Sequence, residues 1–238
     1  MANFPFQRLQ NDLAVLIARS PAGQRLPSEP ELAKQLGVSR ATLREAMRTF
    51  ETQGLIRRRQ GSGTFVVGKV AVLDSGLEML ESLETMARRL GLEVSVSDLE
   101  VERIAADDEY PKALNVAVGT PLTRVRRVIR AESRPVAYLV DILPEAILSP
   151  NHLPADFHGS VLDFLQERGD SLISSRANVS AIGGTAEVAK ALEIQRGDVL
   201  LHFYSQLFNA EGNVVDYSLS YFIPGYFHFH IVRRVGKH

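Results

Sequence analysis

The stretch that decides the fold of the N-terminal part of the chain is LPSEPELAKQLGVSRATLREAMRTFETQGLIRRRQGSGTFV, residues 26–66. Ser28 and Glu31 have the spacing of a capping box, in which a hydroxyl and a carboxylate satisfy free amides at a helix start. Gly37 fits the left-handed position that ends a helix, and Ser39 can cap the next one. The pattern predicts two helices joined by a tight turn.

The second of these helices, residues 40–53, has an apolar stripe and a basic side. The stripe consists of Leu43, Ala46, Met47 and Phe50. Arg40, Thr42 and Arg44 fall off the stripe near the helix start. This arrangement matches a helix-turn-helix, whose second helix enters the major groove of DNA. Arginine can bind a guanine edge or a phosphate there, although a solvated basic face is the alternative interpretation.

A short hairpin follows the second helix. Residues 55–59 and 64–67 alternate as strands, and a glycine-containing turn with Gly61 and Gly63 separates them. The glycines allow the tip of the hairpin to approach a sugar-phosphate surface closely. With the amphipathic helix expected at residues 5–19, this predicts a winged helix-turn-helix, and an ordinary exposed hairpin is the alternative.

The charge distribution agrees with a DNA-binding N-terminal part. Residues 1–68 contain ten Lys/Arg and five Asp/Glu, whereas residues 69–238 contain 17 and 23, which together give the formal net charge of −1. A basic segment joined to an acidic one suggests that only the first meets a polyanion. Random fluctuation could also produce such a difference in charge.

Composition excludes several classes of protein. The chain has 238 residues, is 45% hydrophobic and contains no cysteine, which rules out disulfides, thiolate zinc sites and cysteine nucleophiles. No stretch approaches the roughly 20 apolar residues of a membrane span. The N-terminus lacks the basic and apolar regions of a secretory signal. We therefore expect a cytoplasmic protein.

Residues 5–67 resemble the winged-helix domain of GntR-type bacterial transcription regulators. The resemblance implies operator contacts at the recognition-helix cap, at the arginine and Ser/Thr residues beside it, and at the wing glycine. Many members have an arginine where this chain has Pro30, and we expect Arg25 or Lys34 to replace that contact. The predicted operator contacts are Arg25, Ser39, Arg40, Thr42, Arg44, Gly61, Ser62 and Gly63.

The remainder of the chain is internally repeated. A helix is predicted at residues 75–90 from its spaced leucines. Beyond it, residues 101–122 align without gaps to residues 179–200, and eight of the 22 positions are identical at a constant offset of 78. Two halves related by a pseudo-twofold axis are expected, with a cleft where they meet.

Each half reads as a strand, a helix and two more strands. The predicted strands are residues 96–104, 123–131 and 136–143, then 175–182, 200–208 and 214–222; the predicted helices are residues 107–116 and 185–194. The short turns within each half favour antiparallel pairing, with the helices covering one face of the sheet. The order indicates an α+β fold.

Residues 75–234 resemble the UTRA ligand-sensing domain of the HutC branch of GntR regulators, which implies a chorismate-lyase-like α+β fold. The resemblance depends on domain position, element order and the closing pattern from Val215 to Phe222. Strand-rich sequence disfavours the all-helical sensor domain of other branches. The expected division is a DNA-binding domain at 1–68, a linker at 69–74, and an effector-binding and dimerisation domain at 75–238.

Arg127 stands among apolar neighbours on one face of its predicted strand. A buried arginine needs a partner, which is either a carboxylate of the protein or an anionic effector. The resemblance implies effector contacts at Arg127, Ser174, Arg176, Asp216 and Phe222. Ile129 and Leu139 stand where amino-sugar-sensing members have an arginine and a glutamate, which disfavours a phosphosugar.

No catalytic constellation, metal site or cofactor motif is predicted. His228 and His230 alternate on one strand face, but no third ligand has a fixed spacing, so ordinary surface or core histidines are favoured over a metal pair. The leading hypothesis is a homodimeric repressor that a small molecule releases from double-stranded operator DNA. An enzyme of lyase-like fold with a DNA-binding segment and a non-specific architectural DNA-binding protein are the alternatives.

Overall fold

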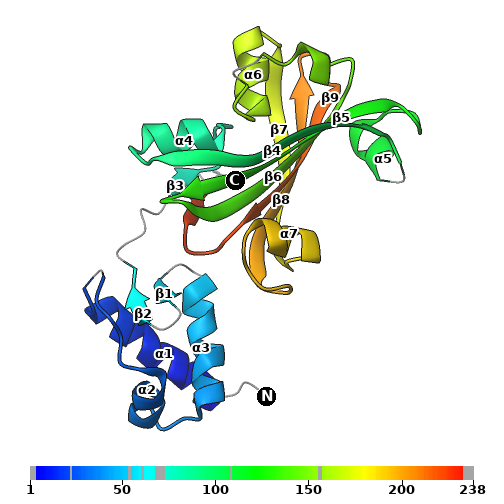
Figure 1. Cartoon of the computed structure of the whole chain (residues 1–238). Helices are drawn as coiled ribbons and strands as arrows, with labels where there is room; N and C mark the ends of the chain where they lie inside the picture. Colours follow the sequence, from blue (N-terminus) through cyan, green and yellow to red (C-terminus); the bar gives the residue numbers. More distant parts are fainter. Residues whose placement is uncertain are drawn as a thin grey trace, which may run out of the picture. The chain divides into compact units, whose positions relative to one another are not determined.

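A computed structural model of the chain describes residues 4–21, 23–52, 55–59, 62–67, 73–107, 109–154 and 157–232. The chain divides into two compact units (Figure 1). The first comprises Met1–Val72 with the short segment Pro224–Phe227, and the second comprises Leu73–Ile223 with His228–His238. Within the described residues, no helix is long and apolar enough to span a membrane.

The N-terminal unit consists of three helices and a hairpin, as the sequence predicts. Its elements are α1 (Phe4–Arg19), α2 (Glu29–Gln35), α3 (Arg40–Thr52), β1 (Ile56–Arg59) and β2 (Gly63–Val66). The predicted stripe of α3 is buried and packs with the apolar side of α1 in a single core. Because the core takes up that side of α3, the opposite side is left for solvent or a partner.

The C-terminal unit is built on one antiparallel sheet of six strands. The strands are β4 (Val94–Ala105), β5 (Pro121–Ala131), β6 (Arg134–Pro144), β7 (Leu172–Gly183), β8 (Val199–Asn209) and β9 (Val214–Phe222). Their order across the sheet is β4-β5-β6-β9-β8-β7. Each half of the sequence therefore supplies three adjacent strands, and the halves join where β6 pairs with β9 (Figure 1). The predicted α+β class is confirmed.

The helix predicted before the first repeat is shorter than expected, and a strand precedes it. The helix expected at 75–90 begins only at Leu83, as α4 (Leu83–Arg89), because Ser82 caps it by accepting a hydrogen bond from the Thr85 amide at 2.9 Å. Residues Leu73–Gly76 instead form a strand, β3, which pairs with β10 (Phe227–His230). That pairing partner lies at the other end of the sequence.

Each repeat also includes a helix before its first strand. The helix α6 (Val161–Arg168) follows its cap Ser160 as α4 follows Ser82, at the same offset of 78 residues. Two equivalent residues touch: the Thr85 hydroxyl lies 3.3 Å from the Asp163 carboxylate. Residues at equivalent positions of two repeats can touch only close to the symmetry axis that relates the repeats. The pseudo-twofold axis therefore passes close to Thr85 and Asp163, and between the paired residues Val140 and Leu219.

The second helix of each repeat is fastened to the opposite repeat. These helices are α5 (Tyr110–Leu114) and α7 (Ala186–Ala191). The Tyr138 hydroxyl on β6 donates to Glu187 of α7 at 2.8 Å, and the Tyr217 hydroxyl on β9 donates to Glu109, the N-cap of α5, at 2.8 Å. These reciprocal Tyr–Glu bonds join the two halves on the sheet side that we call the α5/α7 face.

The other side of the sheet, the α4/α6 face, has a separate apolar core. Val125, Leu143 and Leu207 from the strands pack there with Val161 and Leu165 of α6. Arg127 and Asp141 point to the same face, since they alternate in parity with the residues of the α5/α7 face. The α4/α6 face therefore contains buried charges next to a core of ordinary composition.

Candidate DNA interface and effector pocket

The start of α3 presents the predicted recognition residues to the outside. The Ser39 hydroxyl accepts a hydrogen bond from the Thr42 amide at 3.1 Å, and the two hydroxyls lie 2.8 Å apart. This cap satisfies a free amide of the first turn. Ser39, Arg40 and Arg44 are exposed and Thr42 is partly exposed. The structure brings these four residues together at one end of a helix whose other side is buried.

Arg44 has a partner that the sequence reading did not anticipate. Its Nε lies 2.8 Å from the Glu29 carboxylate in the first turn of α2, and Arg58 of β1 is 3.9 Å from the same carboxylate. The charge of Arg44 is therefore partly balanced without DNA. No local pattern connects Glu29 to Arg44, because their contact depends on the angle between two helices.

The other predicted DNA contacts that the structure describes, Arg25, Ser62 and Gly63, lie at the wing, the hairpin of β1 and β2. Leu26 donates its amide to the Thr64 carbonyl at 2.8 Å, which lays the segment with Arg25 beside β2. Gly63 has φ of +106°, and a Cβ there would stand 2.6 Å from Nε of Arg25. The positive φ favours glycine at this position, and a larger residue would also displace the end of the Arg25 side chain. Ser62 donates its amide to the Arg59 carbonyl, whereas Gly61 lies outside the described residues.

The second predicted site, for an effector, centres on a buried ion pair. The Arg127 guanidinium pairs with Asp141 of β6 and lies 3.4 Å from Glu84 of α4. Burial by itself would lower the pKa of Arg127, but attraction to Asp141 and Glu84 outweighs burial and raises it. The protein thus supplies carboxylate partners for Arg127, which is the first of the two possibilities that the sequence left open.

Asp216 and Phe222 of β9 lie on the same face of the sheet as this ion pair, and Asp216 lies close enough to interact with both of its charges. Both are buried, with 6% and 4% of their surface exposed. Burial, followed by the nearby charge of Asp141, raises the pKa of Asp216 well above the ordinary 3.8. The fold thus brings Arg127, Asp216 and Phe222 to one side of the sheet.

Ser174 and Arg176 are not part of that group. They lie on the exposed edge strand β7, and their parity directs them to the α5/α7 face. Arg176 donates to Gln206 at 2.5 Å, and Gln206 in turn donates to the Ala113 carbonyl of α5 at 2.6 Å. The described residues of a single chain therefore form no pocket that contains all five predicted contacts.

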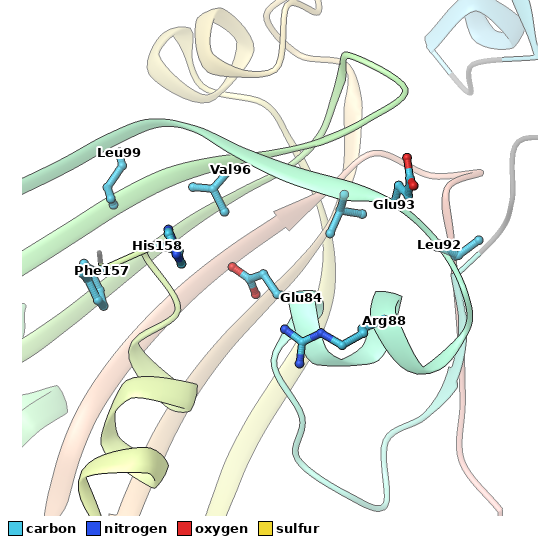
Figure 2. A pocket seen from close by; sticks show the side chains of 9 residues that line it. Glu84, Arg88, Leu92, Glu93, Val96, Leu99, Phe157 and His158 are labelled. Atoms are coloured by element: carbon cyan, nitrogen blue, oxygen red, sulfur yellow. The ribbon is translucent and has the colours of Figure 1, made fainter. Parts of the chain in front are cut away.

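A pocket of about 640 Å³ lies between α4, β4 and the segment before α6 (Figure 2). Its lining residues are Glu84, Arg88, Leu92, Glu93, Val94, Val96, Leu99, Phe157 and His158. The volume is in the range of small-molecule sites. In Figure 2 the Glu84 side chain extends from α4 towards the segment with Phe157 and His158. The sequence reading missed this pocket, because its walls come from three separated segments.

Gly159 connects the pocket to the buried ion pair. Its φ is +94°, and a Cβ there would lie 2.7 Å from Cδ of Arg127 and 3.1 Å from Leu99. The absence of a side chain lets the segment with His158 close over Arg127. Glu84 belongs to both features, since it lines the pocket and contacts Arg127.

Comparison with known proteins identifies both units. The profile of the bacterial regulatory proteins of the gntR family matches residues 6–66, and the UTRA domain profile matches residues 89–228. The chain is a UTRA-type member of the GntR family. The predicted winged helix-turn-helix and UTRA domains are confirmed in that order along the chain.

Relatives of this GntR protein include named repressors. It is 28% identical over 200 residues to the HTH-type transcriptional repressor NagR of Bacillus subtilis, covering 82% of this chain and 79% of NagR. It is 29% identical over 184 residues to the histidine utilization repressor of Pseudomonas putida, covering 76% of this chain and 72% of that repressor. The crystal structure of PhnF from Mycobacterium smegmatis shares the fold, with a TM-score of 0.64 and 21% identity over 96% of this chain and 100% of that chain.

The family assignment decides between the hypotheses raised by the sequence. The GntR protein is a DNA-binding transcription regulator with an effector-binding UTRA domain. Its family and its relatives are transcription regulators rather than enzymes, which rejects the lyase alternative.

Proposed function

We propose that this GntR protein is a homodimeric repressor that reads its operator through α3 and the wing and leaves it when a small molecule fills the pocket beside Arg127. The observation that supports the proposal best is the exposed, Ser39-capped start of α3, with Arg40 and Arg44 opposite the buried stripe. The N-terminal residues of a recognition helix are those that reach base edges. Relatives with repressor names support the sign of regulation.

The proposed operator contacts fall into two groups. Ser39, Arg40, Thr42 and Arg44 belong to the recognition helix, where Glu29 orients Arg44. Arg25, Ser62 and Gly63 belong to the wing, together with Gly61. We assign these to a DNA-binding domain at residues 1–68. The linker predicted at 69–74 is proposed to end before Leu73, because β3 (Leu73–Gly76) already belongs to the second unit, so the effector domain begins there rather than at residue 75. Arg25 takes the place of the arginine contact that Pro30 removes.

The test of this assignment is operator selection followed by a matched pair of variants. The wild-type chain is used to select an operator from randomised duplexes, and binding is measured by fluorescence anisotropy at fixed salt. Arg40→Ala is expected to weaken cognate binding about tenfold or more with little effect on random DNA, because a base-edge contact is sequence-specific. Arg48→Ala, two turns further along α3, is the control. Equal losses on both DNAs would contradict base reading by Arg40, and selection of no sequence would support the architectural alternative.

The proposed effector site is the pocket of Figure 2, with Arg127 next to its Glu84 and Leu99 walls and with Asp216 and Phe222 on the same face of the sheet. An effector that binds one arrangement of the dimer better than the other shifts the population by that difference in affinity. The winged helices of the favoured arrangement then no longer match the half-site spacing. Ser174 and Arg176 are left out of the pocket because they lie on the other face.

Two copies are proposed because an operator of two half-sites matches a twofold protein. Large apolar side chains are exposed along β7 and β8, including Val179 at 51% and Tyr204 at 39%. Light scattering is expected to give twice the chain mass of 26.3 kDa. Val179→Glu is expected to shift the mass towards one chain, and a monomeric wild type would contradict the proposal. A regulator of this kind works in the cytoplasm, where its operator is.

A further inference from the structure

The buried charges beside the pocket do not balance. Arg127 is the one guanidinium of the group, and it faces the carboxyl groups of Asp141, Glu84 and Asp216. Within the described part of the chain, Glu84 Oε2 and Asp216 Oδ1 are both buried and have no hydrogen-bond partner. A buried oxygen without a partner is costly, so native proteins rarely keep one without a reason.

The sister repeat shows that the fold does not need these charges. At the offset of 78 residues, Ser205 stands on β8 where Arg127 stands on β5. After a gap of one residue, the offset of 79 that relates Tyr138 to Tyr217 places Ser220 on β9 where Asp141 stands on β6. Leu162 of α6 is the equivalent of Glu84. The second repeat builds the same strands and helix from these uncharged residues. Arg127, Asp141 and Glu84 are therefore specific to the half that holds the pocket, and Asp216 joins them from β9 of the other half.

The pocket walls indicate what else the ligand contains. Leu92, Val94, Val96, Leu99 and Phe157 provide an apolar lining, and Glu84 provides an acidic group at the side nearest Arg127. The other polar lining residues, Arg88, Glu93 and His158, are exposed, whereas Glu84 is partly buried. An anionic ligand would add negative charge beside Glu84, whereas a cationic ligand would balance that charge and its N–H group would satisfy the unpartnered Oε2 of Glu84.

We propose that the effector is a small organic cation, a protonated amine or amidinium on an apolar body, whose nitrogen donates to the carboxylate of Glu84 in the pocket wall. This rests on the proposed function, since it assigns the chemistry of the same pocket. The apolar body lies between Leu99 and Phe157, and the ring face of Phe157 suits a neighbouring cation.

The test compares three probes of nearly equal shape and different charge on the full-length protein. They are phenethylammonium chloride, the neutral phenethyl alcohol and the anionic hydrocinnamate, each at millimolar concentration. The melting temperature is expected to rise with the ammonium probe and to stay nearly unchanged with the others, because only a ligand that binds the folded state stabilises it. An equal rise for all three, a larger rise with hydrocinnamate, or no rise with the ammonium probe overturns the proposal.

A matched pair of variants then places the cation. Glu84→Gln, which keeps the size of the side chain and removes its charge, is expected to weaken binding of the ammonium probe about tenfold by calorimetry. Glu100→Gln makes the same change on the other face of β4, outside the pocket, and is expected to leave binding nearly unchanged. Equal effects of the two variants would overturn the assignment to Glu84. Operator selection with the unliganded wild type is independent of these results, so a chain that selects an operator but ignores the cation refutes this inference alone.

Discussion

Replacing Arg127 tests how much the buried ion pair on the α4/α6 face matters for the free energy of unfolding. In Arg127→Met, the carboxylate of Asp141 loses its cation while its side chain stays about 11% exposed. Removing one partner of a buried ion pair typically destabilises a protein by about 3–5 kcal/mol.

The same reasoning predicts how this destabilisation depends on pH. Arg127 lowers the pKa of the neighbouring Asp216, which burial and the charge of Asp141 raise. Without Arg127 that pKa rises further, so ionisation of Asp216 opposes folding more strongly in the variant than in the wild type. The difference in stability from wild type is therefore expected to shrink as pH falls from 7 to 5. Urea denaturation of the full-length chain, followed by circular dichroism at both pH values, measures this difference.

Two further variants complete the test. Arg126→Met changes the neighbouring residue, whose side chain is 24% exposed and paired with Glu100 and Glu102, and it is expected to cost under about 1 kcal/mol. Arg127→Met combined with Asp141→Leu replaces the pair by apolar groups and is expected to recover most of the loss. A loss no larger than that of Arg126→Met, or one that does not vary with pH, would refute the reasoning.

Three other outcomes are expected. Gly63→Ala should destabilise the N-terminal unit by roughly 1–3 kcal/mol and weaken operator binding, because φ is +106° and the new Cβ meets Arg25; unchanged melting and anisotropy would count against this view of the wing. Asp216→Asn should gain stability relative to wild type as pH rises above about 4, because the raised pKa of Asp216 means that its ionisation opposes folding; parallel pH profiles in urea denaturation would contradict it. Ser82→Ala should cost about 1 kcal/mol by thermal denaturation, because it removes the cap on the Thr85 amide, and an unchanged melting temperature would show that the cap is dispensable.

Much of the fold follows from local patterns. The buried stripe of α3 and the strands β4 to β9 are predicted to within a few residues, because periods of 3.6 and 2 and the intervening turns are properties of adjacent residues. The strand β3 was missed and a helix was predicted in its place, because its partner β10 lies about 150 residues away in sequence. The helix α6 was missed although Ser160 repeats Ser82, since the sequence identity between the repeats is weak in that region.

The candidate sites were predictable to different degrees. The positions of the recognition residues near Ser39 can be predicted from the cap and the apolar stripe of a single helix. The structure adds their ion-pair partners, such as Glu29 for Arg44. The effector site depends on which face of a sheet a strand residue occupies. Within one strand, alternation shows that Arg127 points away from its immediate neighbours. It does not show that Arg176, on another strand, points to the opposite face of the sheet from Arg127. That assignment needs the register of all six strands.

The reciprocal Tyr–Glu bonds have a consequence for how the effector domain came to be and how it unfolds. Each duplicated half places its second helix against a strand of its sibling, so a half cut out of the chain would keep the helix and lose the surface on which it sits. Neither half is then an autonomous folding unit, and the domain is expected to gain and lose its structure in one cooperative step. An ancestor of single length would have needed a second chain to supply the missing strand, which makes a pair of identical short chains the simplest precursor of the present fused molecule.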